Sequence, residues 1–518
     1  MLNIVKIIMR YDKMELKVQQ LQIKAGKYKV VLNTQDAREI GVRGGDRVQL
    51  KDHSYLTAIV ETGDMIQKGT VGVYQECCER LGKVCPLTVD IIPTSRPSSI
   101  GFIKKMMDHQ KLTQEEIYQI VQDIVKENLT EIEMSAFVTS SYINGMTSDE
   151  IEWLTRAMID SGEKIEFNTH PIMDKHSIGG VPGNKISLLV VPIVAANGLL
   201  IPKTSSRAIT GAAGTADLME VLAPVEFSAD EIKSITERVG GVIAWGGATN
   251  IAPADDKLIR AEYPLSIDPR CQLLASIMAK KGAVGADCVV IDIPTGSGTK
   301  VPTMEEGKKL ARDLIELGER LGMNVECAMT YGASPVGRTI GPAIEVREAL
   351  KVLETMQGPN SLIEKSTALA GILLEMGGVA TKGRGKEVAM ETLRSGKALN
   401  KLKEIIEAQG GNPKIVHTDI KPGEHRAELA SPADGYVIEF DNKRIVEIAR
   451  MAGAPTDIGA GVWIHRKKGE TVKKGEPLIT IFADKSWKLT SALKSAEKDN
   501  PIIVEGMLLE RVQTFRVF

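Results

Sequence analysis

Apolar and polar residues follow three different patterns along the chain. From residue 14 to about 92 the apolar residues form short runs bounded by turn residues, which is typical of β-strands. From about 113 to 160 they recur every three or four positions, which predicts amphipathic helices. Beyond 170 strand-like and helical segments alternate, which favours a sheet covered by helices. The strand-like runs of the first region are 28–33, 47–50, 57–61 and 70–74.

Three helix starts in the second region share one pattern, a threonine followed three positions later by a glutamate. In such a capping box the two side chains satisfy backbone N–H groups that the first turn leaves unpaired. Together these helices predict a small helical domain. The pairs are Thr113 and Glu116, Thr130 and Glu133, and Thr147 and Glu150.

The third region contains a nearly continuous apolar run at 287–293, of the kind found in buried parallel strands. Residues 240–245 and 324–330 are further strand candidates. The largely apolar segment 186–201 fits either a helix or a strand followed by a helix. Helices are expected at 305–322, 343–356 and 362–376.

These patterns predict a multidomain α/β protein. Its expected parts are an N-terminal, β-rich, barrel-like domain at 1–92 and a helical domain at 96–168, joined by roughly 252–285. A mixed-sheet, phosphate-binding α/β domain follows at 170–425, with a cleft between it and the helical domain. A C-terminal α+β domain closes the chain at 430–518.

Glycine, lysine and hydroxyl residues gather in two loops, 175–185 and 203–217, on either side of the apolar segment. Glycines let backbone N–H groups approach an anion closely, and lysines and hydroxyls add further donors. One such loop suits one phosphate, so two loops suggest that substrate and nucleophile both carry phosphate. A third glycine-rich loop, 294–300, follows the buried strand candidate and is expected to face the same site.

Composition narrows the classes of partner. The net charge is −2 and aromatic residues make up 4%, which argues against nucleic acid and membrane surfaces as partners. No apolar run reaches the roughly 18 residues of a membrane span. The cysteines lack paired metal-ligand spacing, so we expect no metal site and a reducing, cytoplasmic location. Cys77, Cys78 and Cys85 are expected to be buried thiols.

Four segments together resemble the thymidine/pyrimidine nucleoside phosphorylase family. Residues 205–220 are similar to its signature nearly position by position, and 175–181 resembles its phosphate loop. Residues 275–281 resemble its base-recognition helix, and 296–298 match as well. The resemblance covers about 95–510.

The N-terminal domain, Pro182 and Lys300 fit the archaeal, nucleotide-cleaving branch of this family. The resemblance implies reversible cleavage of a nucleoside 5′-monophosphate by phosphate, giving free base and ribose 1,5-bisphosphate. AMP is the expected substrate, with CMP and UMP as further ones. Phosphate is the implied co-substrate, with no other cofactor, and a homodimer or larger homo-oligomer is implied.

The family match also assigns residues to the two anions. Phosphate is expected at Lys175, Ser177, Ser187 and Ser205. The nucleotide is expected at ten positions, of which Thr215 is also linked to the phosphate. They are Gly180, Ser206, Arg207, Ala208, Ile209, Thr210, Gly211, Thr215, Ser276 and Lys300.

Asp268 is the candidate proton donor to the leaving base. Such general acid help contributes roughly 10²–10⁴-fold to a rate. The carboxyl would need burial to keep a proton at neutral pH. A helix N-cap is an equally plausible role from the residues alone, and the resemblance favours catalysis. His176 fits either ribose positioning or a structural hydrogen bond.

Two departures from the nucleoside enzymes bear on specificity. Ala261 occupies the slot of a base-contacting arginine, which widens the expected range of bases to purines. Lys300 replaces an apolar residue and is available for a 5′-phosphate, or is a solvated surface lysine. Lys203 and Arg207 fit structural ion pairs equally well.

Three alternatives remain open from the sequence. A pyrimidine nucleoside (thymidine) phosphorylase is the first. An enzyme of the anthranilate phosphoribosyltransferase type is the second, although acidic metal ligands are not evident. A non-catalytic assembly scaffold is the third, and the intact glycine loops speak against it.

Overall fold

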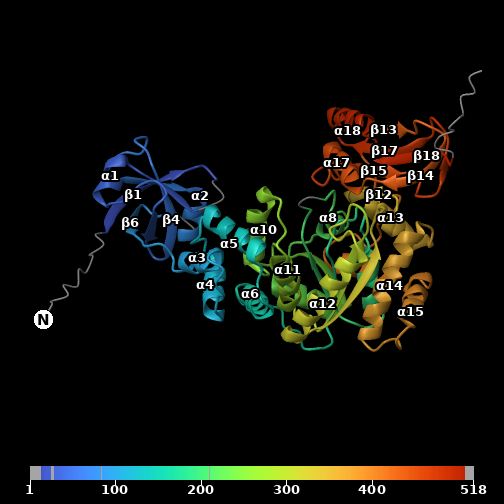
Figure 1. The fold of residues 1–518 in the computed structure, drawn as a ribbon, viewed down its shortest axis with the longest axis horizontal. Coiled ribbons are helices and arrows are strands. Elements are labelled where there is room, and N and C mark those ends of the chain that lie inside the picture. Colours follow the sequence, from blue (N-terminus) through green and yellow to red (C-terminus); the bar gives the residue numbers. More distant parts are fainter. Residues whose placement is uncertain (1–12, 25–27, 83–84, 209–210, 508–518) are drawn as a thin grey trace, which may run out of the picture. The chain divides into compact units, whose positions relative to one another are not determined.

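The computed structural model describes residues 13–24, 28–82, 85–208 and 211–507 (Figure 1). The chain divides into two compact units. The first comprises Met1–Ala157 and Ala254–Gln272, and the second comprises Met158–Pro253 and Leu273–Phe518. No helix among the described residues is long and apolar enough to cross a membrane.

Six strands of the first unit close into a barrel, in the order β1-β5-β2-β4-β3-β6. All four strand-like runs predicted for this region are strands, and β1 and β6 complete the barrel. Apolar side chains such as those of Val30 and Leu50 are fully buried inside it. The elements are β1 (Met14–Leu21), β2 (Lys29–Leu32), α1 (Thr34–Glu39), β3 (Arg47–Lys51), β4 (Tyr55–Thr62), β5 (Thr70–Tyr74), α2 (Gln75–Leu81) and β6 (Thr88–Pro93).

The cysteines of the barrel do not all behave as predicted. Cys77 is a buried thiol whose Sγ donates to the backbone oxygen of Lys29 at 3.3 Å, and burial raises its pKa to about 12. Cys78 and Cys85 form a disulfide. The prediction of three buried thiols is therefore wrong for this pair.

Three helices in the helical part of the first unit begin with the predicted capping boxes, and all three boxes are formed. Buried Arg47 ties the barrel to these helices, because its Nε donates to the backbone oxygen of Asn128 at 3.0 Å and its guanidinium pairs with Glu133. The helices are α3 (Ser99–Met107), α4 (Gln114–Val125), α5 (Glu131–Asn144), α6 (Ser148–Asp160), α10 (Pro253–Glu262), η1 (Tyr263–Leu265) and α11 (Arg270–Ala283), and α6, α10 and α11 cross the boundary between the units.

The second unit is built on parallel strands. One sheet has the order β11-β10-β7, and a second pairs β8 with β9. A parallel bridge between Ile172 and Leu200, just before β7 and β8, links the two sheets. A mixed sheet is predicted from the sequence, but every pairing among these five strands is parallel. The strands are β7 (Met173–Ser177), β8 (Ile201–Ser205), β9 (Gly241–Trp245), β10 (Cys288–Thr295) and β11 (Asn324–Tyr331).

Helices pack on these strands around one large apolar core. The ambiguous apolar segment is a helix, α7 (Ser187–Ala196), and all its residues from Ser187 to Ala195 are buried. A helix that is apolar all round must lie inside a protein, so α7 sits at the centre of this core. The other helices are α8 (Thr215–Glu220), α9 (Ala229–Val239), α12 (Met304–Leu321), α13 (Pro342–Thr355), α14 (Asn360–Met376), α15 (Gly385–Arg394) and α16 (Lys397–Ala408).

The C-terminal part has two antiparallel sheets and its own apolar core. One sheet, of order β12-β15-β17-β13, includes a strand from the segment before α13, so the C-terminal part is joined to the α/β part by strand pairing. The other sheet has the order β16-β14-β18. The elements are β12 (Thr339–Ile340), β13 (His425–Ala430), β14 (Gly435–Phe440), α17 (Asn442–Ala452), β15 (Gly461–Ile464), β16 (Thr471–Val472), β17 (Pro477–Ala483), α18 (Ser486–Lys498) and β18 (Ile502–Glu505).

Candidate active site

The three glycine-rich loops leave the carboxyl ends of parallel strands in the second unit. The phosphate loop follows β7, the signature loop follows β8, and the third loop follows β10. Since β7 pairs with β10 and a bridge joins the starts of β7 and β8, the loops leave the same edge of the strands. Open parallel sheets bind ligands at this edge.

The phosphate loop and the third loop touch each other. Gly180 has φ +86°, and a β-carbon placed on it would lie 2.8 Å from the backbone nitrogen of Lys300 and 3.4 Å from Cα of Thr299. Only glycine suits both this backbone conformation and this contact. The predicted nucleotide residues Gly180 and Lys300 are therefore neighbours.

The signature loop is closed by Asp217 of α8. Its Oδ2 accepts hydrogen bonds from the backbone nitrogens of Ala208 and Gly214, both at 2.8 Å. A β-carbon on Gly214 would lie 2.6 Å from the backbone oxygen of Ser206, so the two ends of the loop are in contact. One carboxylate and one glycine thus hold residues 206–208 of the loop against Gly214.

Arg207 of this loop makes the ion pairs that the sequence allowed as an alternative. Its guanidinium pairs with Glu220, one bond being 2.7 Å long, and lies 3.3 Å from Glu226. It also lies 4.8 Å from the ring centre of Trp245. The hydrogen bond with Glu220 raises the already high pKa of Arg207 further, so the side chain remains a cation.

Two buried aspartates, Asp174 on β7 and Asp292 on β10, lie among buried lysines. One oxygen of Asp174 pairs with Nζ of Lys281, and the other lies 3.7 Å from Nζ of Lys203. An oxygen of Asp292 lies 2.9 Å from Nζ of Lys365. These side chains are at most 7% exposed. Buried charges are stable only when paired, and these pairs form one cluster because the charge of Lys175 interacts with both aspartates.

Lys175 is the fourth buried lysine of this cluster. Burial lowers its pKa to about 8 although Asp292 opposes the shift, and burial lowers that of Lys203 to about 7. Burial and then the charge of Lys281 hold the pKa of His176 well below its usual value, so this imidazole is neutral. Four lysines face two aspartates, and an anion placed here would stabilise the protonated lysines.

Two of the serines predicted to bind the phosphate, Ser177 and Ser187, lie at the end of β7 and the start of α7. Oγ of Ser177 donates to Asp292 at 2.8 Å and accepts from the amide of Asn184 at 3.0 Å. Ser187 begins α7 and is 1% exposed, and its Oγ has no hydrogen-bond partner among the described residues. Buried hydroxyls are normally paired, and a helix N-terminus attracts anions. This orphaned hydroxyl fits a ligand oxygen.

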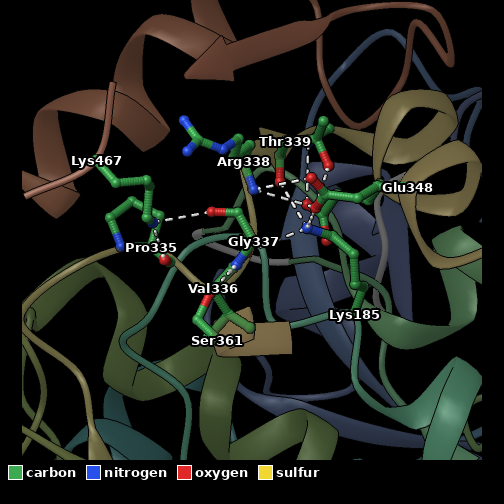
Figure 2. Close-up of polar contacts among 11 residues, drawn as sticks. Lys185, Pro335, Val336, Gly337, Arg338, Thr339, Glu348, Ser361 and Lys467 are labelled. Carbon is green, nitrogen blue, oxygen red and sulfur yellow. Dashed lines mark hydrogen bonds and ion pairs between the residues drawn. The ribbon is translucent and has the colours of Figure 1, made fainter. Parts of the chain in front are cut away.

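The phosphate loop is anchored at its far end by Lys185, whose side chain is fully buried. Its Nζ donates to the backbone oxygens of Val336 and Thr339 at 3.2 and 3.0 Å and lies 2.8 Å from Oε2 of Glu348 (Figure 2). Glu348 also accepts from the backbone nitrogen of Arg338 at 3.0 Å. The segment 334–341 is thus bound to the phosphate loop.

The C-terminal part holds the same segment from the other side. Nζ of Lys467 donates to the backbone oxygens of Pro335 and Gly337 at 2.6 and 2.9 Å (Figure 2). The guanidinium of Arg338 donates to Glu470 at 2.7 Å. Burial lowers the pKa of Lys467 to about 8. Segment 334–341 therefore connects the C-terminal part to the phosphate loop.

Family models match most of the chain in three blocks. Residues 100–162 match the model described as "Glycosyl transferase family, helical bundle domain", and 169–399 match "Glycosyl transferase family, a/b domain". Residues 436–502 match "Pyrimidine nucleoside phosphorylase C-terminal domain".

Several curated proteins match nearly end to end. The AMP phosphorylase of Methanococcoides burtonii is 67% identical over 504 residues, which cover 97% of this chain and 100% of that protein. That of Methanosarcina barkeri is 68% identical over 500 residues, covering 96% and 99%. AMP phosphorylase 1 of Archaeoglobus fulgidus is 56% identical over 499 residues, with the same coverage. The chain belongs to the AMP phosphorylase family.

A solved structure supports the fold of this family member. Anthranilate phosphoribosyltransferase from Thermus thermophilus superposes with a TM-score of 0.51 and 20% identity. The match covers 60% of this chain and 99% of that one. At this identity the likeness concerns the fold alone.

The structure brings the predicted residues of this AMP phosphorylase family member together only in part. Lys175, Ser177 and Ser187 lie on or next to β7 and α7, and Ser205 ends β8. Thr215 is the first residue of α8. Ile209 and Thr210 lie outside the described residues, and no group of acidic, histidine and cysteine side chains suited to a metal occurs among the described ones.

The residues predicted to contact or protonate the base belong to both units. Ser276 on α11 accepts a hydrogen bond from Nζ of Lys280 at 3.4 Å. Asp268 and Ala261 belong to the first unit. Asp268 is exposed there, as is Lys300 in the second unit. The roles of these residues stay predictions.

Both aspartates of the buried cluster and one of its lysines were not recognised from the sequence. Asp174, Asp292 and Lys365 were not singled out, although each lies in a stretch of mostly buried residues. Charged residues are rarely buried without a partner. An ionisable residue inside the apolar run 288–293 was therefore a usable signal for Asp292.

Proposed function

We propose that this chain catalyses the reversible phosphorolysis of nucleoside 5′-monophosphates. AMP and phosphate give adenine and ribose 1,5-bisphosphate, and CMP and UMP are further substrates. The reaction is a step of nucleotide degradation. The observation that carries the proposal is the 67% identity to an AMP phosphorylase over nearly the whole chain.

Phosphate is the nucleophile, and it is proposed to bind at Lys175, Ser177, Ser187 and Ser205. The reaction passes through a cation-like ribose, so the attacking anion must be held beneath the reacting carbon. The buried lysines of the cluster supply the positive charge. The hydroxyl of Ser187, which has no partner in the described part of the chain, supports a phosphate oxygen at the start of α7. Asp174 and Asp292 keep these lysines oriented.

The nucleotide is proposed to bind through the signature loop and the third loop. Residues 206–211 offer backbone N–H groups, except that of Ala208, which donates to Asp217, and Lys300 offers a cation for the 5′-phosphate. The contact between Lys300 and Gly180 supports this role, because Lys300 then lies next to the loop proposed to bind the phosphate. Arg207 is proposed to hold the loop in shape through Glu220 while its backbone meets the ligand.

Asp268 is proposed to donate the proton to the leaving base, and Ser276 to contact the base. Phosphate is the co-substrate, and no organic cofactor or metal is required. The chain is proposed to form a homodimer or larger homo-oligomer in the cytoplasm, without nucleic acid or membrane partners.

The test is phosphate-dependent base release from AMP, adenosine and thymidine by the wild type and by Asp268→Asn and Lys300→Ala. Release from AMP that needs phosphate, and that each substitution lowers at least roughly tenfold, supports the proposal. Faster release from thymidine, unaffected by Lys300→Ala, would instead identify a pyrimidine nucleoside phosphorylase.

A further inference from the structure

One helix of the C-terminal part, α17, meets two of the proposed substrate loops. Its first residue, Asn442, lies against the third loop, and Arg450 in its last turn reaches the signature loop. These are the two loops proposed to bind the 5′-phosphate of the nucleotide. The phosphate loop is anchored separately, through Lys185.

Asn442 is 2% exposed and bonds next to the third loop. Its side-chain nitrogen donates to the backbone oxygen of Gly332 at 2.8 Å. A β-carbon placed on Gly298 would lie 3.7 Å from Cβ of Asn442 and 3.9 Å from its amide nitrogen, so the helix start packs on the third loop. The amide oxygen is buried and has no hydrogen-bond partner among the described residues.

Arg450 and Ala212 attach the signature loop to the same C-terminal part. Nη1 of Arg450 donates to the backbone oxygen of Gly211 at 3.0 Å. The next residue, Ala212, is 4% exposed and belongs to the apolar core of the C-terminal part, together with Ile448 of α17. Ala212 of the loop is therefore inserted into this core, and Arg450 holds the neighbouring Gly211.

We infer that α17 positions the two nucleotide loops relative to each other, and that Asn442 and Arg450 determine the affinity for the 5′-phosphate. A helix is a stiff spacer, because each residue advances it by about 1.5 Å and its backbone bonds resist bending. A ligand that uses donors from both loops needs their spacing to be fixed before it binds. The inference rests on the proposed function, since it concerns the nucleotide of that reaction.

The experiment compares Arg450→Met and Asn442→Ala with matched controls on the same helix. Arg444→Met removes a guanidinium that bonds to Ser495 and Glu447 within the C-terminal part, and Lys443→Ala changes an exposed side chain. The readouts are the KM for AMP at saturating phosphate and the KM for phosphate at saturating AMP. Thermal unfolding midpoints show whether each variant folds. If Arg450→Met or Asn442→Ala does not fold, Arg450→Gln or Asn442→Ser is used in its place.

Losing one loop-fixing hydrogen bond is expected to raise the KM for AMP roughly three- to tenfold, with the KM for phosphate within about twofold of the wild type. The two control variants, Arg444→Met and Lys443→Ala, are expected to retain the wild-type KM values for AMP and for phosphate. Variants that match their controls, or that raise both KM values together, would overturn the inference while wild-type turnover of AMP upholds the proposed function. A wild type that releases no adenine from AMP and phosphate would overturn the proposed function, and the inference with it.

Discussion

Gly180 lies so close to Lys300 that a β-carbon would come within 2.8 Å of the lysine's backbone nitrogen. The two residues belong to loops that follow neighbouring parallel strands, β7 and β10. The contact joins the loop proposed for phosphate to the loop proposed for the nucleotide. The proposed reaction needs these two ligands side by side, so a change at this contact is expected to lower the activity.

Gly180→Ala is expected to lower kcat/KM for AMP at least roughly tenfold, because the new methyl group must displace the backbone of the third loop. Gly179→Ala is the matched control. Gly179 has φ +85°, but a β-carbon there meets nothing within 4 Å. Both variants carry the same backbone strain, so equal losses of kcat/KM would contradict a role for the contact itself.

Anion binding is expected to weaken as the pH rises through the pKa values of Lys203, about 7, and Lys175, about 8. Below these values both lysines are charged and attract an anion, and above them both are neutral. Sulfate is the suitable probe, since it stays a dianion while phosphate itself titrates. The inhibition constant of sulfate against phosphate should rise between roughly pH 6.5 and pH 9, a window that brackets both pKa values. A constant value across that range would show that neither lysine titrates in contact with the anion.

Asp174→Asn is expected to destabilise the second unit by roughly 3–5 kcal/mol, because it leaves Lys281 and Lys203 buried without their anion. Asp174 is 0% exposed. The thermal unfolding midpoint of the variant measures the effect, with Glu326→Gln, at an exposed position on β11, as the control. An unchanged midpoint in Asp174→Asn would mean that the cluster does not depend on this charge.

Lys467→Met is expected to raise the KM for phosphate several-fold with little change in the KM for AMP. The substitution removes the hydrogen bonds from Lys467 to segment 334–341. The same segment supplies the two backbone oxygens to which Lys185 donates. Lys468→Met, at the next and exposed position, is the control. A larger effect on AMP than on phosphate would argue that the segment serves the nucleotide instead.

Much of the fold was predictable where the signal is local. The capping boxes at Thr113 and Thr130 form as expected, because a cap needs only residues three positions apart. The apolar run of β10 is buried along its whole length. The glycine loops could be located for the same reason, since a positive φ value such as that of Gly180 depends on the residue itself.

Long-range contacts were not predictable. β1 alternates weakly between exposed and buried positions and carries several polar residues, so it lacked a clear strand pattern. β12 has two residues and becomes a strand only by pairing with β15. Arg450 and Gly211 are 239 positions apart, and no local pattern links them. The Cys78–Cys85 disulfide joins residues only seven positions apart, and it was missed because a reducing location was expected.

Phosphate, rather than water, is proposed to cleave AMP. The most direct test of this proposal is identification of the sugar product by mass spectrometry after incubation of the protein with AMP and ¹⁸O-labelled inorganic phosphate. The expected sugar product is ribose 1,5-bisphosphate carrying one labelled phosphoryl group, formed in equal amount to adenine. Unlabelled ribose 5-phosphate as the sugar product, or no adenine release from AMP while thymidine is cleaved, would contradict it.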